Sequence, residues 1–208
     1  MRLIGNYRSP YVRRVAVSLK AVEIPFDLEE VSVSKKPEAV KKHNPLVRIP
    51  TLILDDGEVL VESFAILDAI DEMAGPEMSL TPPSGRERRQ VLKITAIGVG
   101  SMEKAQWAFY EGRHRPAEKI HQPWIEHNEQ QVRGGLEYLD GQIKKAGTDG
   151  WIAGTSRMTQ ADITSAVTYS FAKTIRPDLD ILNKVDHLAE FTERCEAMDI
   201  FRTSKIPA

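Results

Sequence analysis

Two serines stand at expected helix starts near the amino terminus, and each helix start can hold an anion. Ser9 precedes Pro10, a pairing that is favoured at the N-cap and first position of a helix. Ser63 follows Glu62 and precedes apolar residues at helical spacing. A helix start presents free backbone N–H groups and the positive end of the helix dipole. The two helix starts could therefore each hold an anion, a thiolate at one and an amino-acid carboxylate at the other.

A proline-containing segment lies between the two serines. Residues 47–51 read Val-Arg-Ile-Pro-Thr, and Pro50 comes just ahead of an expected strand. If the bond before Pro50 is cis, it turns the backbone of Ile49 toward the site at Ser9. A bound peptide can then pair with that exposed main chain like an added strand.

The elements that must position these residues form a small mixed domain. We expect strands at residues 2–6 and 26–33, and a helix that starts after Ser9. A short polar helix is expected at residues 37–42, and the turn signal Asp-Asp-Gly predicts a hairpin of residues 51–54 and 59–61. Ser63 is expected to cap the helix that follows. The predicted order is strand, helix, strand, helix, strand, strand, helix.

Glycine and proline at residues 75–76 and 81–85 then interrupt the chain, and strand signals almost disappear beyond them. Helical periodicity dominates the rest, in segments near 87–110, 123–145, 160–172 and 186–198. We therefore predict an α/β domain at residues 1–76, a linker at 77–85 and an all-α domain at 86–208.

Composition excludes several classes of protein. The 208 residues hold 28 Lys and Arg against 30 Asp and Glu, a formal charge of -2, which favours neither a nucleic acid nor an anionic membrane as partner. A single cysteine permits no internal disulfide and no Cys-rich zinc site. Neither a signal peptide nor a stretch of roughly 18 apolar residues is apparent. We expect a cytoplasmic protein.

Several fragments, in this order, resemble the cytosolic glutathione transferases of the serine type, such as the tau, zeta and theta-like classes. Residues 9–15 resemble their amino-terminal active-site stretch, and residues 44–50, Asn-Pro-Leu-Val-Arg-Ile-Pro, resemble their Asn-Pro-x-x-(Lys/Gln)-Val-Pro segment. Glu62-Ser63 resembles their Glu-Ser pair, and residues 151–162 resemble their carboxyl-domain signature. The resemblance implies a thioredoxin-like domain followed by a helical bundle.

The same resemblance implies roles for single residues. Ser9 would donate a hydrogen bond to the sulfur of glutathione. Ile49 would pair through its backbone with the cysteinyl part, beside a cis-Pro50. Glu62 would hold the γ-glutamyl ammonium and Ser63 its carboxylate.

Other assignments complete the expected site. Arg48 stands where the family often has Lys or Gln, and Lys36 is a candidate for the glycyl carboxylate. Tyr11, Trp107 and Tyr110 are candidates to line the pocket for the electrophile. No metal is expected.

Structural alternatives exist for most of these residues. Ser9 and Ser63 could act only as helix caps, and Glu62 could pair with a basic neighbour. Tyr7 or Tyr11 could replace Ser9 as the contact to sulfur.

Other polar or reactive residues are expected to be structural. Asp162 follows Thr159 at capping-box spacing, and Cys195 in a late amphipathic helix is typical of a small core residue. The irregular spacing of His114, His121 and His127 disfavours a metal site and indicates surface positions.

The leading hypothesis is an enzyme that conjugates glutathione, as its co-substrate, to a hydrophobic electrophile. A glutathione-dependent isomerase, dehalogenase or lyase on the same fold, and a non-catalytic binding or regulatory protein, are the alternatives. The resemblance also implies a homodimer.

Overall fold

The computed structural model describes residues 1–207, and these divide into two compact units. The first holds residues 1–83 and 197–207, and the second holds residues 84–196. The predicted linker at residues 77–85 spans this division, but the last residues depart from the expected boundaries because they pack with the first unit. The division of roles between the two expected domains stays a prediction.

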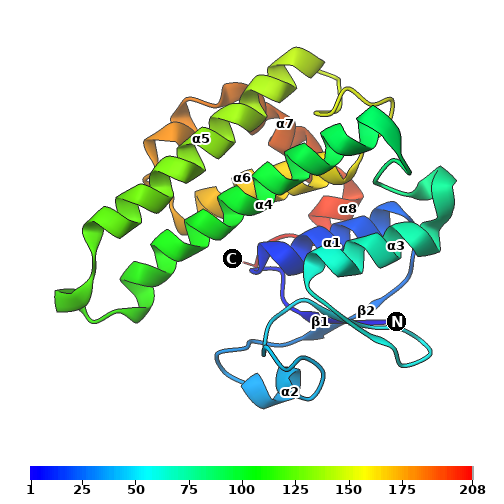
Figure 1. Cartoon of the computed structure of the whole chain (residues 1–208), viewed down its shortest axis with the longest axis horizontal. Coiled ribbons are helices and arrows are strands. Elements are labelled where there is room, and N and C mark those ends of the chain that lie inside the picture. Colours follow the sequence, from blue (N-terminus) through cyan, green and yellow to red (C-terminus); the bar gives the residue numbers. More distant parts are fainter. Residues whose placement is uncertain (208) are drawn as a thin grey trace. The chain divides into compact units, whose positions relative to one another are not determined.

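The first unit is built on a four-stranded mixed sheet of the thioredoxin-like kind (Figure 1). Its strands are β1 (Arg2–Gly5), β2 (Asp27–Glu30), β3 (Thr51–Ile53) and β4 (Val59–Val61). The order across the sheet is β2-β1-β3-β4, with β2 parallel to β1 and the other pairs antiparallel. The expected β-α-β-α-β-β-α order is confirmed, although β2 is shorter than predicted.

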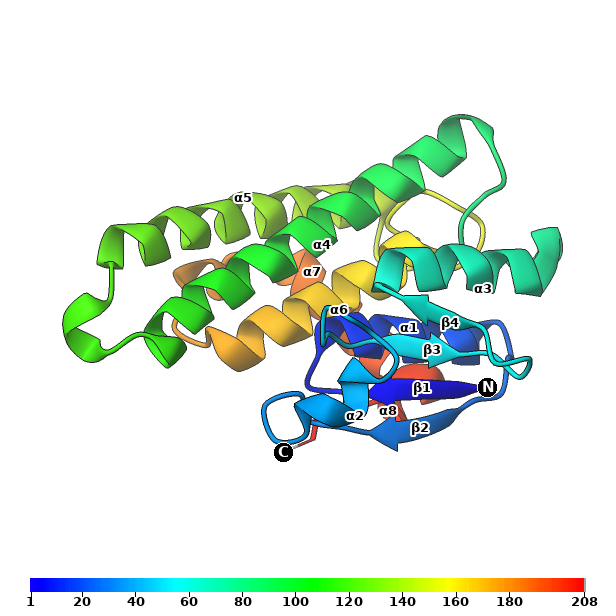
Figure 2. The same cartoon turned by 60° about the horizontal axis from the view of Figure 1, so that its bottom comes forward.

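Helices cover both faces of this sheet (Figure 2). The first unit has helices α1 (Pro10–Ala21), α2 (Pro37–Lys41), α3 (Ser63–Met78) and α8 (Asp199–Arg202). Helices α1 and α3 pack against each other on one face, and α2 lies on the other. Ile4, Val31 and Val40 form a buried cluster between the sheet and α2.

The second unit is entirely helical within the part of it that the structure describes. It contains α4 (Gly85–His114), α5 (Gln122–Ala146), α6 (Gln160–Ile175) and α7 (Asp186–Glu196), with short 3-10 turns at Ala117–Lys119 and Asp180–Asn183. Helix α4 packs along both α5 and α6. All four expected helical segments are confirmed, and several extend beyond their predicted ends.

Two structural predictions for the second unit are confirmed. Thr159 and Asp162 form the capping box of α6, with Asp162 Oδ2 accepting the Thr159 N–H at 2.8 Å. Cys195 is a fully buried free thiol, and burial raises its pKa to about 12. Among residues 1–207, no helix combines the length and apolar content that a membrane span requires.

Candidate active site

Ser9 is the N-cap residue of α1. Its backbone is extended (φ −79°, ψ 120°), and its hydroxyl oxygen accepts a hydrogen bond from the Val12 N–H at 3.4 Å. Pro10 at the next position needs no N–H partner. A hydroxyl that accepts one hydrogen bond still has its own proton to donate. Capping the helix and donating to a bound anion are therefore compatible roles for Ser9.

A tight turn presents Ser9. The Ser9 N–H donates to the carbonyl of Asn6 at 3.1 Å, and Asn6 Oδ1 accepts the Arg8 N–H at 3.2 Å. Asn6 Nδ2 in turn donates to the carbonyl of Val31 at 2.7 Å, which fixes the turn to the chain just after β2. The position of Ser9 is thus set by the amide of Asn6 as well as by α1.

Tyr7 also lies in this turn. The Lys20 ammonium lies 5.7 Å from the centre of its ring. Burial raises the pKa of Tyr7, and the side chain of Ser204 opposes that rise. The choice of Ser9 over Tyr7 as the donor to a ligand stays a prediction. Tyr11 is half-buried in the first turn of α1.

Asn44 organises the loop that leads to Pro50. Its buried side chain donates from Nδ2 to the Arg48 carbonyl at 3.0 Å and accepts the Leu46 N–H on Oδ1 at 2.9 Å. Thr51 Oγ1 donates to the same Arg48 carbonyl at 3.3 Å. One asparagine therefore holds the Leu46 amide and the Arg48 carbonyl inside the Asn-Pro-x-x-x-x-Pro segment.

The Ile49–Pro50 peptide bond is cis, which is the geometry considered for this segment. Ile49 and Val47 pack against the buried cluster of Ile4, Val31 and Val40. Within residues 1–207, neither the N–H nor the C=O of Ile49 makes a hydrogen bond. The loop thus offers unpaired main chain at a rigidly packed position, as strand-like binding of a peptide requires.

Glu62 and Ser63 lie where β4 meets α3. Ser63 is the first residue of α3, so the expectation that it is the N-cap was wrong; Glu62 occupies that position without a side-chain cap bond. Glu62 has φ 66°, a left-handed value that is uncommon for a non-glycine residue. Such a conformation costs about 1–3 kcal/mol, and residues that adopt it cluster at functional sites.

Charged residues flank this junction. The Arg48 guanidinium lies 3.3 Å from the Glu62 carboxylate. Glu62 therefore pairs with a basic neighbour, as the structural alternative for this residue expected. Both side chains are exposed by about half, and a pair of this kind is worth at most about 1 kcal/mol. Lys36 is exposed at the N-cap position of α2.

Comparison with known proteins shows what the chain is similar to. Residues 3–78 match the model of the N-terminal domain of glutathione S-transferases. A solved glutathione S-transferase from Methylobacillus flagellatus KT, with glutathione bound, has a TM-score of 0.90 and 28% identity over 99% of both chains. The chain is thus similar to glutathione S-transferases over its whole length.

Two further proteins show similarity over the whole chain. A glutathione S-transferase from Methylobacterium radiotolerans, in complex with glutathione sulfonate, has a TM-score of 0.89 at 26% identity and covers 100% of this chain and 97% of its own. The uncharacterized GST-like protein YibF of Escherichia coli is 24% identical over 100% of this chain and 99% of its own. The class within the family stays a prediction.

The aromatic residues expected to line the electrophile pocket divide between the two units of the chain. Tyr11 belongs to the first unit, and Trp107 and Tyr110 belong to α4 of the second. Trp107 is 49% exposed and Tyr110 39% exposed, and the Tyr110 ring packs edgewise on His114 at 4.9 Å. Their assignment to a pocket stays a prediction.

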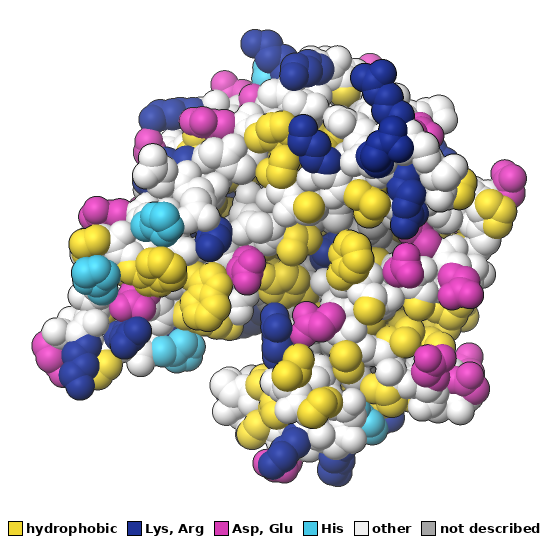
Figure 3. Space-filling view, viewed as in Figure 1, with side chains coloured by type: hydrophobic (Ala, Val, Ile, Leu, Met, Phe, Trp, Pro, Cys, Tyr) yellow, Lys and Arg dark blue, Asp and Glu magenta, His cyan; other side chains and the backbone are white. Residues whose placement is uncertain are grey.

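A pocket of about 390 Å³ opens at one end of the second unit, where α4 and α5 are joined. It is lined by Glu111, Arg115, Lys119, His121 and Trp124. Figure 3 shows hydrophobic and histidine side chains close together at the end of the second unit where α4 and α5 are joined. None of the predicted site residues lines this pocket.

The histidines show surface positions, as expected. His114, His121 and His127 are all exposed. Among residues 1–207, no group of three or more His, Cys, Asp or Glu side chains has an arrangement that could hold a metal ion.

Asn44 organises the loop before Pro50 but received no role from the sequence. It begins a recognised motif, and its position before a proline was the available signal for a structural role. The hydrogen bonds from Arg13 and Lys20 of α1 to Ser204 carried no such signal, because they join residues more than 180 positions apart.

Proposed function

We propose that this protein binds glutathione in its first unit and activates the thiol for attack on a hydrophobic electrophile. The observation that carries the proposal is the geometry of Ser9. Its oxygen accepts the Val12 N–H, which leaves the hydroxyl proton for a sulfur anion at the start of α1. The solved transferase from M. flagellatus, with glutathione bound, supports glutathione as the ligand.

The remaining parts of the tripeptide are matched to the predicted residues. Ile49 offers its unpaired backbone to the cysteinyl part, beside cis-Pro50. The Glu62 carboxylate suits the γ-glutamyl ammonium, and the N-terminus of α3 at Ser63 suits the carboxylate of the same group. Lys36 is the proposed contact for the glycyl carboxylate, and Arg48 orients Glu62 through their ion pair.

Energies of ordinary size suffice for the activation step. A cysteine thiol with a pKa near ~8.5 is only a few per cent ionised at neutral pH. Lowering that pKa by about two requires roughly 2.7 kcal/mol. A hydrogen bond to a charged acceptor contributes about 1.5–3 kcal/mol, and a helix terminus adds about 0.3–1 kcal/mol. Ser9 and the start of α1 can together supply this difference.

In the chemical step that follows, no group of the protein forms or breaks a covalent bond. The thiol releases its proton to water on binding, and the thiolate sulfur forms a bond to the electrophilic carbon while a leaving group departs with its electron pair. The protein contributes binding, orientation and stabilisation of the sulfur anion. Tyr11, Trp107 and Tyr110 remain the proposed contacts of the electrophile.

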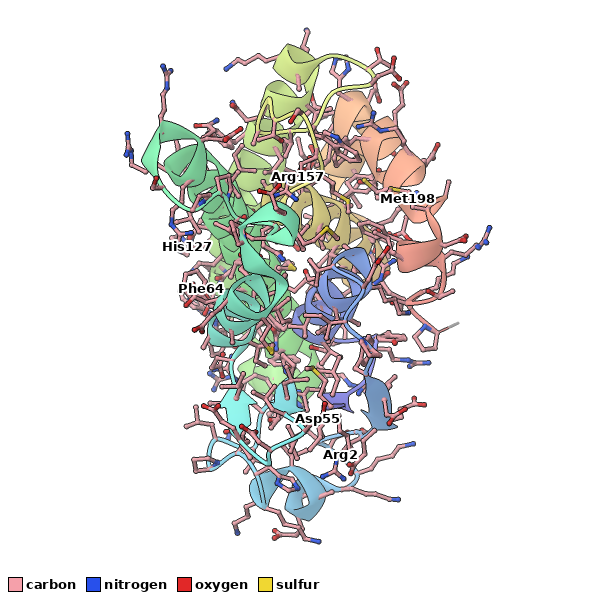
Figure 4. The ribbon with its side chains drawn as sticks, turned by 90° about the vertical axis from the view of Figure 1, so that its right-hand side faces the viewer. Arg2, Asp55, Phe64, His127, Arg157 and Met198 are labelled. Carbon is pink, nitrogen blue, oxygen red and sulfur yellow. The ribbon has the colours of Figure 1, made fainter. Side chains whose placement is uncertain are left out.

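A homodimer is part of the proposal. The first unit exposes several large apolar side chains, including Phe64 at 67% and Leu46 at 60%. Phe64 lies at the start of α3 and is labelled in Figure 4. Exposed apolar surface of this kind favours association with another protein surface. Sedimentation velocity tests this part, with a dimer mass expected and a monomer mass contradicting it.

The test of the function is retention on immobilised glutathione followed by a conjugation assay with chlorodinitrobenzene. Retention with turnover supports the proposed transferase. Retention without turnover of a panel of electrophiles favours the non-catalytic alternative, and an isomerase or dehalogenase would act on substrates of those classes instead.

A further inference from the structure

The pocket where α4 and α5 are joined has no part in the proposed function. It is lined by Glu111, Arg115, Lys119, His121 and Trp124, and we name it the α4–α5 pocket. These residues come from the last turn of α4, the first turn of α5 and the connection between them (Figure 1). All of them belong to the second unit. The volume of about 390 Å³ lies within the range of about 300–1,000 Å³ that is typical of small-molecule sites.

Glu111 fixes the shape of the α4–α5 pocket. Its side chain is only 8% exposed, although it lies near the exposed end of α4. Its Oε2 accepts a hydrogen bond from Arg115 Nε at 3.2 Å, and its Oε1 accepts one from the His121 backbone N–H, also at 3.2 Å. The carboxylate thus uses both oxygens to tie the connection between the two helices back to α4.

Two cations of the α4–α5 pocket keep donors for a ligand. Within residues 1–207, the two Nη groups of Arg115 make no hydrogen bond, and the Lys119 ammonium makes neither a hydrogen bond nor an ion pair. Of the described residues that line the pocket, only Glu111 is acidic, so its charge offsets one of these two cations. The end of α4 and the start of α5 meet here with dipoles of opposite sign. The side chains therefore decide the local charge, which is positive.

Trp124 gives the same pocket an aromatic surface. Its side chain is 40% exposed, and its ring stacks on that of His127 with the ring centres 5.5 Å apart and the planes inclined by 18°. The His127 ring in turn shares a hydrogen bond with Gln131 Nε2 at 2.8 Å. The orientation of the indole is therefore set before any ligand arrives, which lowers the entropic cost of binding a flat ring.

We propose that the α4–α5 pocket binds a small planar aromatic carboxylate. The ring of the ligand stacks on Trp124, and its carboxylate accepts hydrogen bonds from the Nη groups of Arg115 and from Lys119. A guanidinium presents paired donors that match the two oxygens of a carboxylate. The proposal goes beyond the proposed function, because no residue assigned to glutathione or to the electrophile takes part. A purely structural role is the alternative, in which the two cations only stabilise the end of α4 through its dipole.

The probe that tests this is 2-naphthoate, added to the isotope-labelled full chain without glutathione and followed by NMR. We expect amide shifts centred on residues 115–124 and a shift of the Trp124 indole N–H. The dissociation constant should be about 1 mM or below, the affinity that an ordinary ligand of this size reaches. Two matched compounds separate charge from ring: 2-naphthamide lacks the charge, and decahydro-2-naphthoate lacks the flat ring. Each should bind at least about fivefold more weakly.

Substitutions assign the contacts of 2-naphthoate to single residues. Arg115→Lys keeps the charge but loses the paired donors, and Trp124→Leu loses the flat surface, so each should weaken binding about fivefold. Lys119→Gln removes an exposed charge and should weaken binding about threefold. Lys145→Gln is the matched control, because Lys145 is equally exposed but lies in the last turn of the same helix. Its affinity for 2-naphthoate should stay within about twofold of the wild type.

Several results would overturn the proposal. One is equal binding of 2-naphthamide, and another is an absence of saturable shifts at residues 115–124. Variants of Arg115 and Lys119 that unfold at lower urea concentration yet bind 2-naphthoate unchanged would establish the structural alternative. Binding that is lost in Trp107→Leu but kept in Trp124→Leu would place the compound in the proposed electrophile pocket instead. Since no glutathione is present, a chain that fails to bind glutathione contradicts the proposed function and leaves this test intact.

Discussion

The backbone N–H of Val12 donates to the hydroxyl oxygen of Ser9 at 3.4 Å, so one side chain caps α1 and keeps a proton to donate. This contact resolves the apparent conflict between a helix cap and a catalytic serine. The same start of α1 that needs a capping acceptor also provides the dipole that favours a nearby anion.

Asn44 should matter for both stability and ligand binding. Asn44→Ala leaves the Arg48 carbonyl and the Leu46 N–H without their side-chain partner. We expect a loss of about 1–3 kcal/mol in the free energy of unfolding, together with weaker glutathione binding as the Ile49 backbone loses support. Urea unfolding and calorimetric titration measure the two effects. The exposed Asn183→Ala serves as the control, and an equal effect there would contradict the assignment.

Substitutions of Glu62 and Arg48 should differ in their effect on the affinity for glutathione. Glu62→Gln removes the charge proposed to hold the γ-glutamyl ammonium, so we expect glutathione to bind about 10- to 100-fold more weakly. Arg48→Gln breaks only an exposed ion pair, so a change of less than about threefold is expected. Equal losses in the two variants would mean that Arg48 itself contacts the peptide.

Two glycines of α4 should respond in opposite directions to alanine. A Cβ at Gly98 would lie 2.9 Å from Thr164 Cγ2 and 3.0 Å from Thr168 Oγ1 on α6, so Gly98→Ala should destabilise the fold by about 1–3 kcal/mol. A Cβ at Gly100 meets no atom within 4 Å among the described residues, and Gly100→Ala should stabilise the helix by about 0.5–1 kcal/mol. Urea unfolding curves of the two variants measure both changes. A destabilised Gly100→Ala variant would show that this face of α4 is occupied.

Asp162 should make the stability of the fold depend on pH. Its carboxylate accepts hydrogen bonds from the Ile152 and Thr159 amides, and burial raises its pKa above 3.8. The folded protein therefore takes up this proton at a higher pH than the unfolded chain does. The contribution of Asp162 to stability then grows as pH falls from neutral toward 3.8.

Comparison with an uncharged variant isolates this contribution. Asp162→Asn cannot take up the proton, so its deficit in unfolding free energy relative to the wild type should be larger at pH 5 than at pH 7. Urea unfolding at both values provides the measurement. A smaller deficit at pH 5 would mean that the hydrogen bonds from Ile152 and Thr159 outweigh burial and lower the pKa of Asp162 instead.

Much of the fold could be predicted from local sequence signals. Apolar periodicity and the Ser9-Pro10 start predicted α1, and the Asp-Asp-Gly turn predicted the β3–β4 hairpin. Ser63 was expected to cap α3 because serine is a frequent cap residue, but the chain places Glu62 there in a left-handed conformation. Local propensity does not report such strain, because the surrounding structure imposes it.

Contacts between distant parts of the sequence could not be predicted in this way. Helix α8 has only four residues, too short for a periodic pattern, and Ser204 has no neighbouring motif. The hydrogen bonds from Arg13 and Lys20 to Ser204 emerge only when the chain end reaches α1. The candidate residues could therefore be named from the sequence, whereas the packing of the last described residues against α1 could not.

The most direct test of the account is a spectroscopic titration of bound glutathione in the wild type and in Ser9→Ala. We predict that the thiol bound to the wild type has a pKa about two below its free value, and that Ser9→Ala returns most of that difference while binding S-methylglutathione normally. A thiol that stays protonated at neutral pH in the wild-type complex, or one that ionises equally well without the Ser9 hydroxyl, would contradict it.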